Sequence, residues 1–231
     1  MLMPYIEIAH PCANTPFDSN YGIQKVAVMK ECTELGDESF ENATNLDYVY
    51  FEDRETPLSF GGNYIFSGCT SLKEVIIPDG TIGASGLPNH IFSGCTNLSY
   101  IKLPSDLTYF EGGDHFRNCI SLTTLTIPST VTTLHWTSSL GSGSSLEKIY
   151  LNPTTPPTVG GSVALPQEYS MYIVPTESLT GYKTDSGFST VADRIFPTGY
   201  SLYSTFYNAP SSGTMIYTYT ATENCTFDIG E

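Results

Sequence analysis

The chain has 231 residues, of which 14% are charged, and its 24 acidic and 9 basic side chains give a formal net charge of −15. This balance argues against nucleic acid as a partner, because phosphate binding needs clustered Lys and Arg. No run of apolar residues approaches the ~18 that a membrane span needs. The length suits one domain, or one domain with a small appendage.

Residues 1–20 contain no repeat signal and are predicted to form an N-terminal arm, either as a cap on the first strand or as a tether. The segment lacks the basic start and the apolar core of a secretory signal peptide, and it contains Pro4 and Glu7. We therefore expect either that a leader is missing or that the protein leaves the cell by another route, such as a phage particle released by lysis.

A repeat dominates the region from 21 to 175. Residues 66–78, 92–104 and 116–128 share one pattern, in which Phe, Cys and Leu precede a short apolar stretch that ends in Pro. The marker leucines are spaced by 26, 26, 24 and 24 residues; they are Leu46, Leu72, Leu98, Leu122 and Leu146. A period of this size is typical of a solenoid in which each repeat contributes one strand.

The apolar residues at the third and fifth positions after each marker leucine alternate with other residues, so they share one face of a strand. Strands are predicted near 26–28, 49–51, 75–77, 101–103, 125–127, 149–151 and 172–174. We expect one parallel sheet that lines a shallow curve. Residues 58–64 and 81–89 are predicted to be Gly-rich insertions at one edge, and 138–145 to be irregular.

The chain after the repeats divides into two parts. Residues 176–196 are predicted to form a terminal cap with one short helix, and 197–231 a Tyr-rich, hairpin-like β extension with a turn at 208–213. Two strands alone are marginal in water. The extension must therefore pack on the solenoid's own end or on a neighbouring subunit, which leaves a homo-oligomer or larger assembly through 197–231 open.

On its Phe, Cys, Leu and Pro positions, the repeat resembles the BspA-like (Treponema pallidum type) leucine-rich repeat. The resemblance covers roughly 23–196 and is weaker at 40–51, where Ala43 replaces Cys, and at 140–151, where Leu140 and Gly143 replace Phe and Cys. It implies a mainly β solenoid with a parallel sheet and irregular or short helical turns. Proteins of this family are commonly adhesins on bacterial surfaces, which implies an extracellular or surface-displayed protein.

Candidate catalytic and metal residues find little support. Cys69, Cys95 and Cys119 share one repeat position and are expected to stack as small buried side chains, without the paired spacing of a zinc site. The four histidines do not share a repeat position. Motifs for a nucleophile elbow, a phosphate loop or a dinucleotide site are missing. We predict no catalytic residue, no metal, no cofactor and no enzymatic activity.

Acidic residues concentrate between positions 31 and 55, where nine Asp and Glu accompany Arg54 and adjoin Lys30. Two interpretations stay open, a solvated end of the solenoid and a site for Ca²⁺ or for a basic partner. No Asp-rich calcium loop supports the metal version.

The outward residues of the strands form the predicted binding face. If Val75 and Ile77 point inward, Glu74 and Ile76 point outward. The same register gives the outward pairs Lys25/Ala27, Tyr48/Tyr50, Tyr100/Lys102, Thr124/Thr126, Lys148/Tyr150 and Met171/Ile173. The predicted partner-binding residues are Tyr48, Tyr50, Ile76, Tyr100, Lys102 and Tyr150. Exposed aromatic patches usually make contacts, here with a protein or glycan partner on a host or neighbouring subunit, or with the chain's own ends.

The sequence therefore predicts a non-enzymatic, surface-displayed binding or adhesion module that recognises a protein or glycan through the sheet face. The alternative is a structural or decoration component of a bacteriophage virion (head, fibre or tail), anchored through its non-repeat ends.

Overall fold

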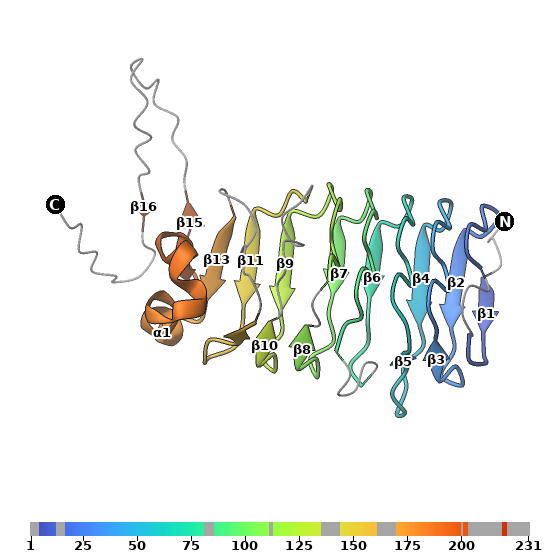
Figure 1. The fold of residues 1–231 in the computed structure, drawn as a ribbon, viewed down its shortest axis with the longest axis horizontal. Coiled ribbons are helices and arrows are strands. Elements are labelled where there is room, and N and C mark those ends of the chain that lie inside the picture. Colours follow the sequence, from blue (N-terminus) through green and yellow to red (C-terminus); the bar gives the residue numbers. More distant parts are fainter. Residues whose placement is uncertain are drawn as a thin grey trace, which may run out of the picture.

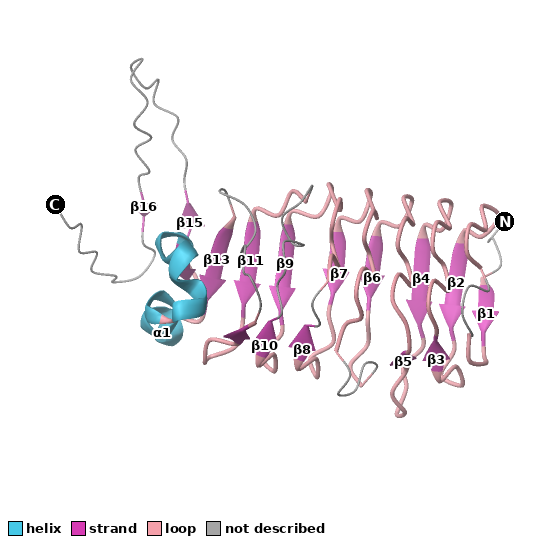
Figure 2. Cartoon of the chain, in the orientation of Figure 1, coloured by secondary structure: helices cyan, strands magenta, loops and turns pink. Residues whose placement is uncertain are grey.

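The computed structural model describes residues 5–12, 17–80, 86–110, 113–134, 144–160, 170–199, 201–202 and 219–220. Over these residues the chain is an elongated solenoid whose strands lie side by side along its length (Figure 1). Strands and loops make up the coils, and the helices sit together at the C-terminal end (Figure 2). The prediction of a mainly β repeat solenoid is confirmed.

The main face consists of two parallel ladders. The first has five strands in spatial order, β1 (Ile6–Ile8), β2 (Lys25–Val28), β4 (Tyr48–Phe51), β6 (Glu74–Ile76) and β7 (Tyr100–Lys102). The second has four, β9 (Thr124–Ile127), β11 (Lys148–Leu151), β13 (Met171–Val174) and β14 (Ile195–Pro197). Each of the seven predicted strands is present within one residue of its expected bounds.

The expectation of one continuous sheet is wrong, because no strand pairing joins β7 to β9 among the described residues. The break falls where the spacing of the marker leucines shortens from 26 to 24 residues. A change in coil length does not by itself end a ladder, since the step from β2 to β4 is 23 residues and the step from β4 to β6 is 26, and these strands still pair. Backbone bonds in the turns still cross this junction, from Phe92 N–H to the His115 carbonyl (3.1 Å) and from Gly94 N–H to the Arg117 carbonyl (2.7 Å).

A second, narrower face runs along the solenoid. Its strands have two residues each and are parallel, namely β3 (Glu34–Leu35) with β5 (Ser59–Phe60), and β8 (Tyr109–Phe110) with β10 (Thr133–Leu134) and β12 (Thr158–Val159). Isolated bridges join Cys12 to Leu35 and Leu87 to Phe110. Residues 58–64 were predicted to be an insertion, and that is wrong, since β5 buries Phe60 in the core. Residues 81–85 and 135–143 lie outside the described residues.

Residues 5–12 add a coil to the N-terminal end. The strand β1 pairs in parallel with β2, with Ile6 opposite Val26 and Ile8 opposite Val28. Ile8 and Cys12 are buried in the same core as the repeats. Of the two alternatives for the N-terminal arm, this pairing corresponds to a cap on the first strand.

Aromatic rings stack through the core in register with the coils. Neighbouring ring centroids lie 5.3, 5.3, 5.8 and 6.0 Å apart, with ring planes within 8° of parallel, along the series Phe17, Phe40, Phe66, Phe92 and Phe116. This column crosses the junction between the two ladders, so the core is continuous where the main sheet is not.

The cysteine column lies beside the aromatic column. Cys69, Cys95 and Cys119 are fully buried free thiols, as predicted. Each thiol also donates a 3.1 Å hydrogen bond to the carbonyl of the Phe one coil earlier, Phe40 for Cys69 and Phe66 for Cys95. These bonds explain why Cys suits the position, since it is small and apolar but still carries a weak donor.

The turn before each Cys requires a left-handed backbone. Gly68 and Gly94 have φ of 72° and 77°, and Asn42 and Asn118 occupy the same position with φ of 54° and 58°. Gly and Asn are the residues that adopt this conformation at least cost. The Gly/Asn choice in the repeat therefore follows from the geometry of the turn.

The C-terminal end is covered by η3 (Thr176–Ser178), α1 (Leu179–Thr184) and η4 (Ser186–Arg194). Tyr182 of α1 is fully buried, donates to the Pro153 carbonyl (2.9 Å) and meets Phe188 edge-on. Beyond it, β15 (Ser201–Leu202) and β16 (Tyr219–Thr220) pair antiparallel, as expected for a hairpin-like extension. The rest of the predicted extension, 203–218 and 221–231, lies outside the described residues.

Candidate functional site

The outward residues of β4, β6 and β7 form an exposed patch on the main face. Tyr48, Tyr50, Ile76 and Tyr100 are 38%, 44%, 46% and 50% exposed, while the residues between them point into the core. Glu74 pairs with both Tyr48 and Tyr100, so these three side chains form one row across the sheet. The alternation of the strand places this row on one surface.

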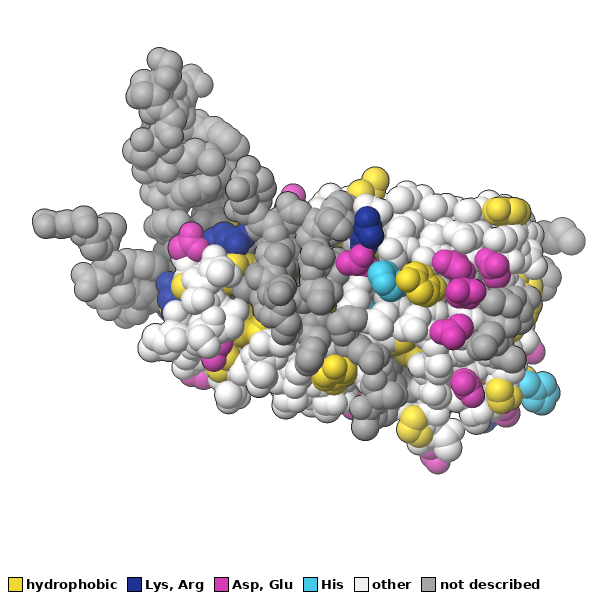
Figure 3. Space-filling model, in the orientation of Figure 1, with side chains coloured by type: hydrophobic (Ala, Val, Ile, Leu, Met, Phe, Trp, Pro, Cys, Tyr) yellow, Lys and Arg dark blue, Asp and Glu magenta, His cyan; other side chains and the backbone are white. Residues whose placement is uncertain are grey.

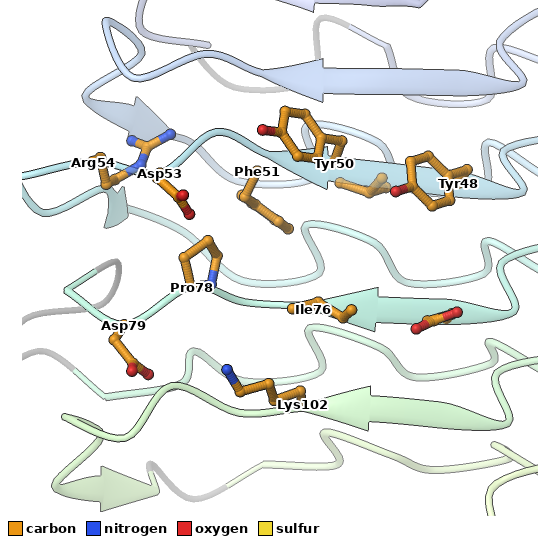
Figure 4. A pocket seen from close by; sticks show the side chains of 11 residues that line it. Tyr48, Tyr50, Phe51, Asp53, Arg54, Ile76, Pro78, Asp79 and Lys102 are labelled. Atoms are coloured by element: carbon orange, nitrogen blue, oxygen red, sulfur yellow. The ribbon is translucent and has the colours of Figure 1, made fainter.

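A groove of ≈ 510 Å³ opens beside this row. Its walls are Tyr48, Val49, Tyr50, Phe51, Asp53, Arg54, Glu74, Ile76, Pro78, Asp79 and Lys102. The labelled side chains come from β4, β6 and β7 and from the loops that follow β4 and β6 (Figure 4). The groove therefore has an aromatic and aliphatic part over the strands and a charged part at their C-terminal ends.

Four of the six predicted partner-binding residues line this groove, namely Tyr48, Tyr50, Ile76 and Lys102. Tyr100 is exposed next to Glu74 but lies outside the lining. Tyr150 belongs to β11 in the other ladder and is half-buried. The structure therefore brings five of the six residues onto one ladder and leaves Tyr150 apart from them. Their role in binding stays a prediction.

Two of the residues in the predicted outward positions are not exposed. Ala27 and Ile173 are only 6% and 7% exposed. Ala27 lies between Glu7 on β1 and Tyr50 on β4. Ile173 lies between longer side chains on β11 and β14 in the same way. An outward side chain that is shorter than its neighbours on both adjacent strands can therefore be covered by those neighbours.

Tyr5 extends the aromatic surface toward the N-terminus. Its ring lies edge-on to Tyr48 with 6.0 Å between centroids, and the Lys25 ammonium sits 5.8 Å from its centre. Burial, with smaller contributions from Tyr5, Glu74 and Tyr50, raises the pKa of the Tyr48 phenol. Tyr48 is therefore a neutral phenol at physiological pH, available for stacking and as a hydrogen-bond donor.

The charged part of the groove contains Asp53 and Asp79, which are not among the predicted partner-binding residues. Asp53 belongs to the acidic stretch 31–55, for which a site for Ca²⁺ or a basic partner was one of two open interpretations. Asp79 accepts a 2.7 Å hydrogen bond from the Ser105 backbone N–H. That bond lowers the pKa of the Asp79 carboxyl, with a smaller contribution from Lys102. Both aspartates follow the end of a strand, which is the sequence signal that they share.

Arg54 lines the groove, but its guanidinium is hydrogen-bonded to the protein backbone. Its guanidinium donates to the carbonyls of Cys32 (2.8 Å), Met29 (3.0 Å) and Val28 (3.3 Å) in the preceding coil. Burial lowers the pKa of the Arg54 side chain. The cation therefore ties two coils together and is a weak candidate for contact with a ligand.

The described histidines do not converge. His90 stacks on Tyr64 with 4.5 Å between ring centres, and His115 is buried with Nδ1 2.9 Å from the Pro88 carbonyl oxygen. Within the described ranges, no group of three or more His, Cys, Asp or Glu is placed to hold a metal ion. Over the same ranges, every helix is too short or too polar to cross a lipid bilayer.

These features define a leucine-rich-repeat solenoid with an exposed aromatic groove on its main face. Residues 12–139 match the BspA type Leucine rich repeat region in six copies. The match covers more than half of the chain, and the chain belongs to this family, as predicted from the repeat.

Several solved structures are similar to this chain. A leucine-rich repeat protein from Eubacterium ventriosum is 27% identical, with a TM-score of 0.47 over 58% of this chain and 34% of that one. A leucine rich cell surface protein from Faecalibacterium prausnitzii is 19% identical, with a TM-score of 0.43 over 74% and 59%. The T. pallidum leucine rich repeat protein is 17% identical, with a TM-score of 0.36 over 74% and 69%.

The chain thus spans about a third of the Eubacterium protein and less than two thirds of the Faecalibacterium protein. No curated protein sequence matches it.

Proposed function

We propose that this chain is a non-enzymatic binding module that recognises a protein or glycan through the part of the main face that β4, β6 and β7 form. The observation that supports the proposal is the patch of exposed Tyr48, Tyr50, Ile76 and Tyr100 beside the ≈ 510 Å³ groove. Large apolar and aromatic patches on a soluble domain usually mark contact sites. Membership of a family whose proteins are commonly bacterial surface adhesins supports display outside the cell.

The mechanism requires no chemistry on the ligand. Tyr48 and Tyr50 project from β4, which is paired on both sides, and Tyr100 projects from β7, which is paired with β6. Little conformational freedom is therefore lost when a partner docks, and the binding energy is not spent on ordering the surface. Tyrosine adds large contact area with few rotatable bonds. The virion alternative gains no support from the structure or from the comparisons.

The test compares two matched double variants on arrays of glycans and of extracellular proteins. Tyr48→Ala with Tyr100→Ala removes two rings from the main face, and Tyr21→Ala with Tyr64→Ala removes two exposed rings from the turns. We expect the first variant to lose binding and the second to keep it. Equal binding by both variants, or loss in both, would show that the main face is not the recognition surface.

A further inference from the structure

We propose that the groove beside Tyr50 receives a lysine or arginine side chain from a basic segment of a protein partner. The inference rests on the proposed function, because it names the ligand class of that same face. Four observations support it: the composition of the groove walls, the exposure of their carboxylates, the hydrogen bonds that Arg54 already makes to the backbone, and the negative charge of the surrounding coils.

The groove walls match the two parts of a long basic side chain. Tyr48, Tyr50 and Ile76 provide aromatic and aliphatic surface for the methylene stem, and tyrosine faces also attract a cation. Asp53 and Asp79 lie at the other end of the groove, beyond the strands (Figure 4). An ammonium or guanidinium group at that end would meet carboxylates while its stem remains on the rings.

The carboxylates of the groove are exposed. Asp53, Glu74 and Asp79 are all on the surface, and the backbone N–H of Ser105 holds the pKa of Asp79 below its ordinary value. Lys102 lies outside ion-pair distance of every carboxylate among the described residues. The three acids are therefore not neutralised by a close partner, and a ligand cation can pair with them.

Arg54, the other basic residue of the groove besides Lys102, already makes hydrogen bonds within the protein. Arg54 gives its guanidinium hydrogen bonds to three backbone carbonyls of the preceding coil. The groove consequently offers an anionic ligand only Lys102, against three carboxylates. An acidic segment would face net repulsion there.

The charge of the surrounding coils points the same way. Nine Asp and Glu lie between positions 31 and 55, against Arg54 within that stretch and a chain-wide net charge of −15. Acidic side chains gather over the N-terminal coils on the face drawn in Figure 3. The negative electrostatic potential of these side chains attracts a basic partner toward the groove and repels an acidic one, whereas it leaves a neutral glycan unaffected. A basic protein segment is therefore favoured over a glycan.

The test uses fluorescein-labelled short peptides of alternating Lys and Ser, and of alternating Glu and Ser, followed by fluorescence anisotropy with the full chain. We expect saturable binding of the Lys peptide that weakens with added salt, and no binding of the Glu peptide. Asp53→Asn with Asp79→Asn should weaken the Lys peptide by about tenfold, since each exposed pair contributes modestly. The Asn oxygen at 79 can still accept from Ser105.

The matched control carries the same change in net charge elsewhere. Glu177→Gln with Asp193→Asn removes two exposed acids from the C-terminal cap, and its affinity should stay within about twofold of the native chain. Equal weakening by this control would overturn the proposal, because binding would then reflect overall charge. Absence of any Lys-peptide binding would overturn it as well.

A parallel glycan array, probed with the native chain and with Tyr50→Ala, separates failure of this inference from failure of the proposed function. Tyr50-dependent glycan binding without Lys-peptide binding would overturn the basic-segment proposal and leave the binding face in place. If no ligand on either array depends on Tyr50 or on the Tyr48 and Tyr100 pair, the proposed function fails too.

Discussion

Truncation of one ring in the middle of the phenylalanine column should cost far more stability than truncation at its end. Phe66 is fully buried, with Phe40 and Phe92 stacked at 5.3 and 5.8 Å and Phe51 edge-on at 6.4 Å. Removing a fully buried Phe leaves a cavity and loses both stacking partners, so Phe66→Ala should lower the free energy of unfolding by about 3–5 kcal/mol.

Phe17 provides the comparison at the N-terminal end of the column. It is only partly buried and stacks on one ring, Phe40, at 5.3 Å. Because Phe17 is less completely buried and has one stacking partner where Phe66 has two, Phe17→Ala should cost only about 1–2 kcal/mol. A total stability of about 5–15 kcal/mol is normal for a domain, so Phe66→Ala removes a large share and Phe17→Ala a small one.

The measurement is urea unfolding followed by far-ultraviolet circular dichroism, with native and variant chains compared at one temperature. Chains built from repeats owe their stability to the interfaces between neighbouring units. A central ring contributes to two such interfaces and a terminal ring to one. If Phe17→Ala costs as much as Phe66→Ala, or if Phe66→Ala costs less than about 1.5 kcal/mol, the stacked column is not a main source of stability.

The remaining predictions concern thiols, turns and the main face. Burial raises the pKa of Cys69 and Cys119 from 9.0 to about 12. Their contribution to stability is complete below pH 9 and is lost as the pH rises toward 12, so the urea midpoint should fall from pH 9 upward and the Cys69→Ala, Cys119→Ala variant should show a shallower fall. Gly94→Asn should unfold at nearly the native urea concentration, whereas Gly94→Val should cost about 1–3 kcal/mol, because a β-branched residue resists the left-handed turn. Tyr48→Ala with Tyr100→Ala should shift the melting temperature by only a few degrees, since both side chains lie on the outward face and not in the core; a shift of about 10 °C would show that they are structural.

The strands and the core columns could be predicted because each depends on local pattern alone. The alternation after each marker leucine separates Val75 from Ile76 whatever the rest of the chain does, and the recurrence of Cys at one position places Cys95 between its two neighbours. The exposure of Tyr50 and Tyr100 follows from the same alternation. Because the same pattern recurs in every coil, a strand position that is uncertain in one coil can be assigned from the matching position in the others.

Features that occur once could not be predicted in this way. The strand β1 carries none of the Phe, Cys or Leu landmarks, so Tyr5 was not placed beside Tyr48. The acidic end of the groove depends on where the loops after β4 and β6 lie in space, and the sequence does not show that Asp53 of the acidic stretch and Asp79 line the same groove. Arg54 looks like a solvated charge in an acidic stretch, and only the packing of the preceding coil shows that it binds three carbonyls.

The sheet break shows a different limit of sequence patterns. A change in spacing from 26 to 24 residues is visible in the sequence at the break between β7 and β9, but the change from 23 to 26 between β2, β4 and β6 leaves the ladder intact. The Leu98 and Leu122 markers predict a strand on each side equally well. They carry no information on whether the two backbones come close enough to pair.

The regular separation of bonded residues has a consequence for folding. Hydrogen bonds between successive coils join residues that are 21 to 29 positions apart, from the Met29 N–H and the Ile8 carbonyl near one end to the Tyr182 hydroxyl and the Pro153 carbonyl near the other. Each coil therefore closes a loop of nearly the same length, with nearly the same loss of chain entropy. Once one pair of coils has formed, the next coil can add to it by closing another loop of similar length. A chain of this architecture can grow by whole repeats without lengthening any loop that folding must close.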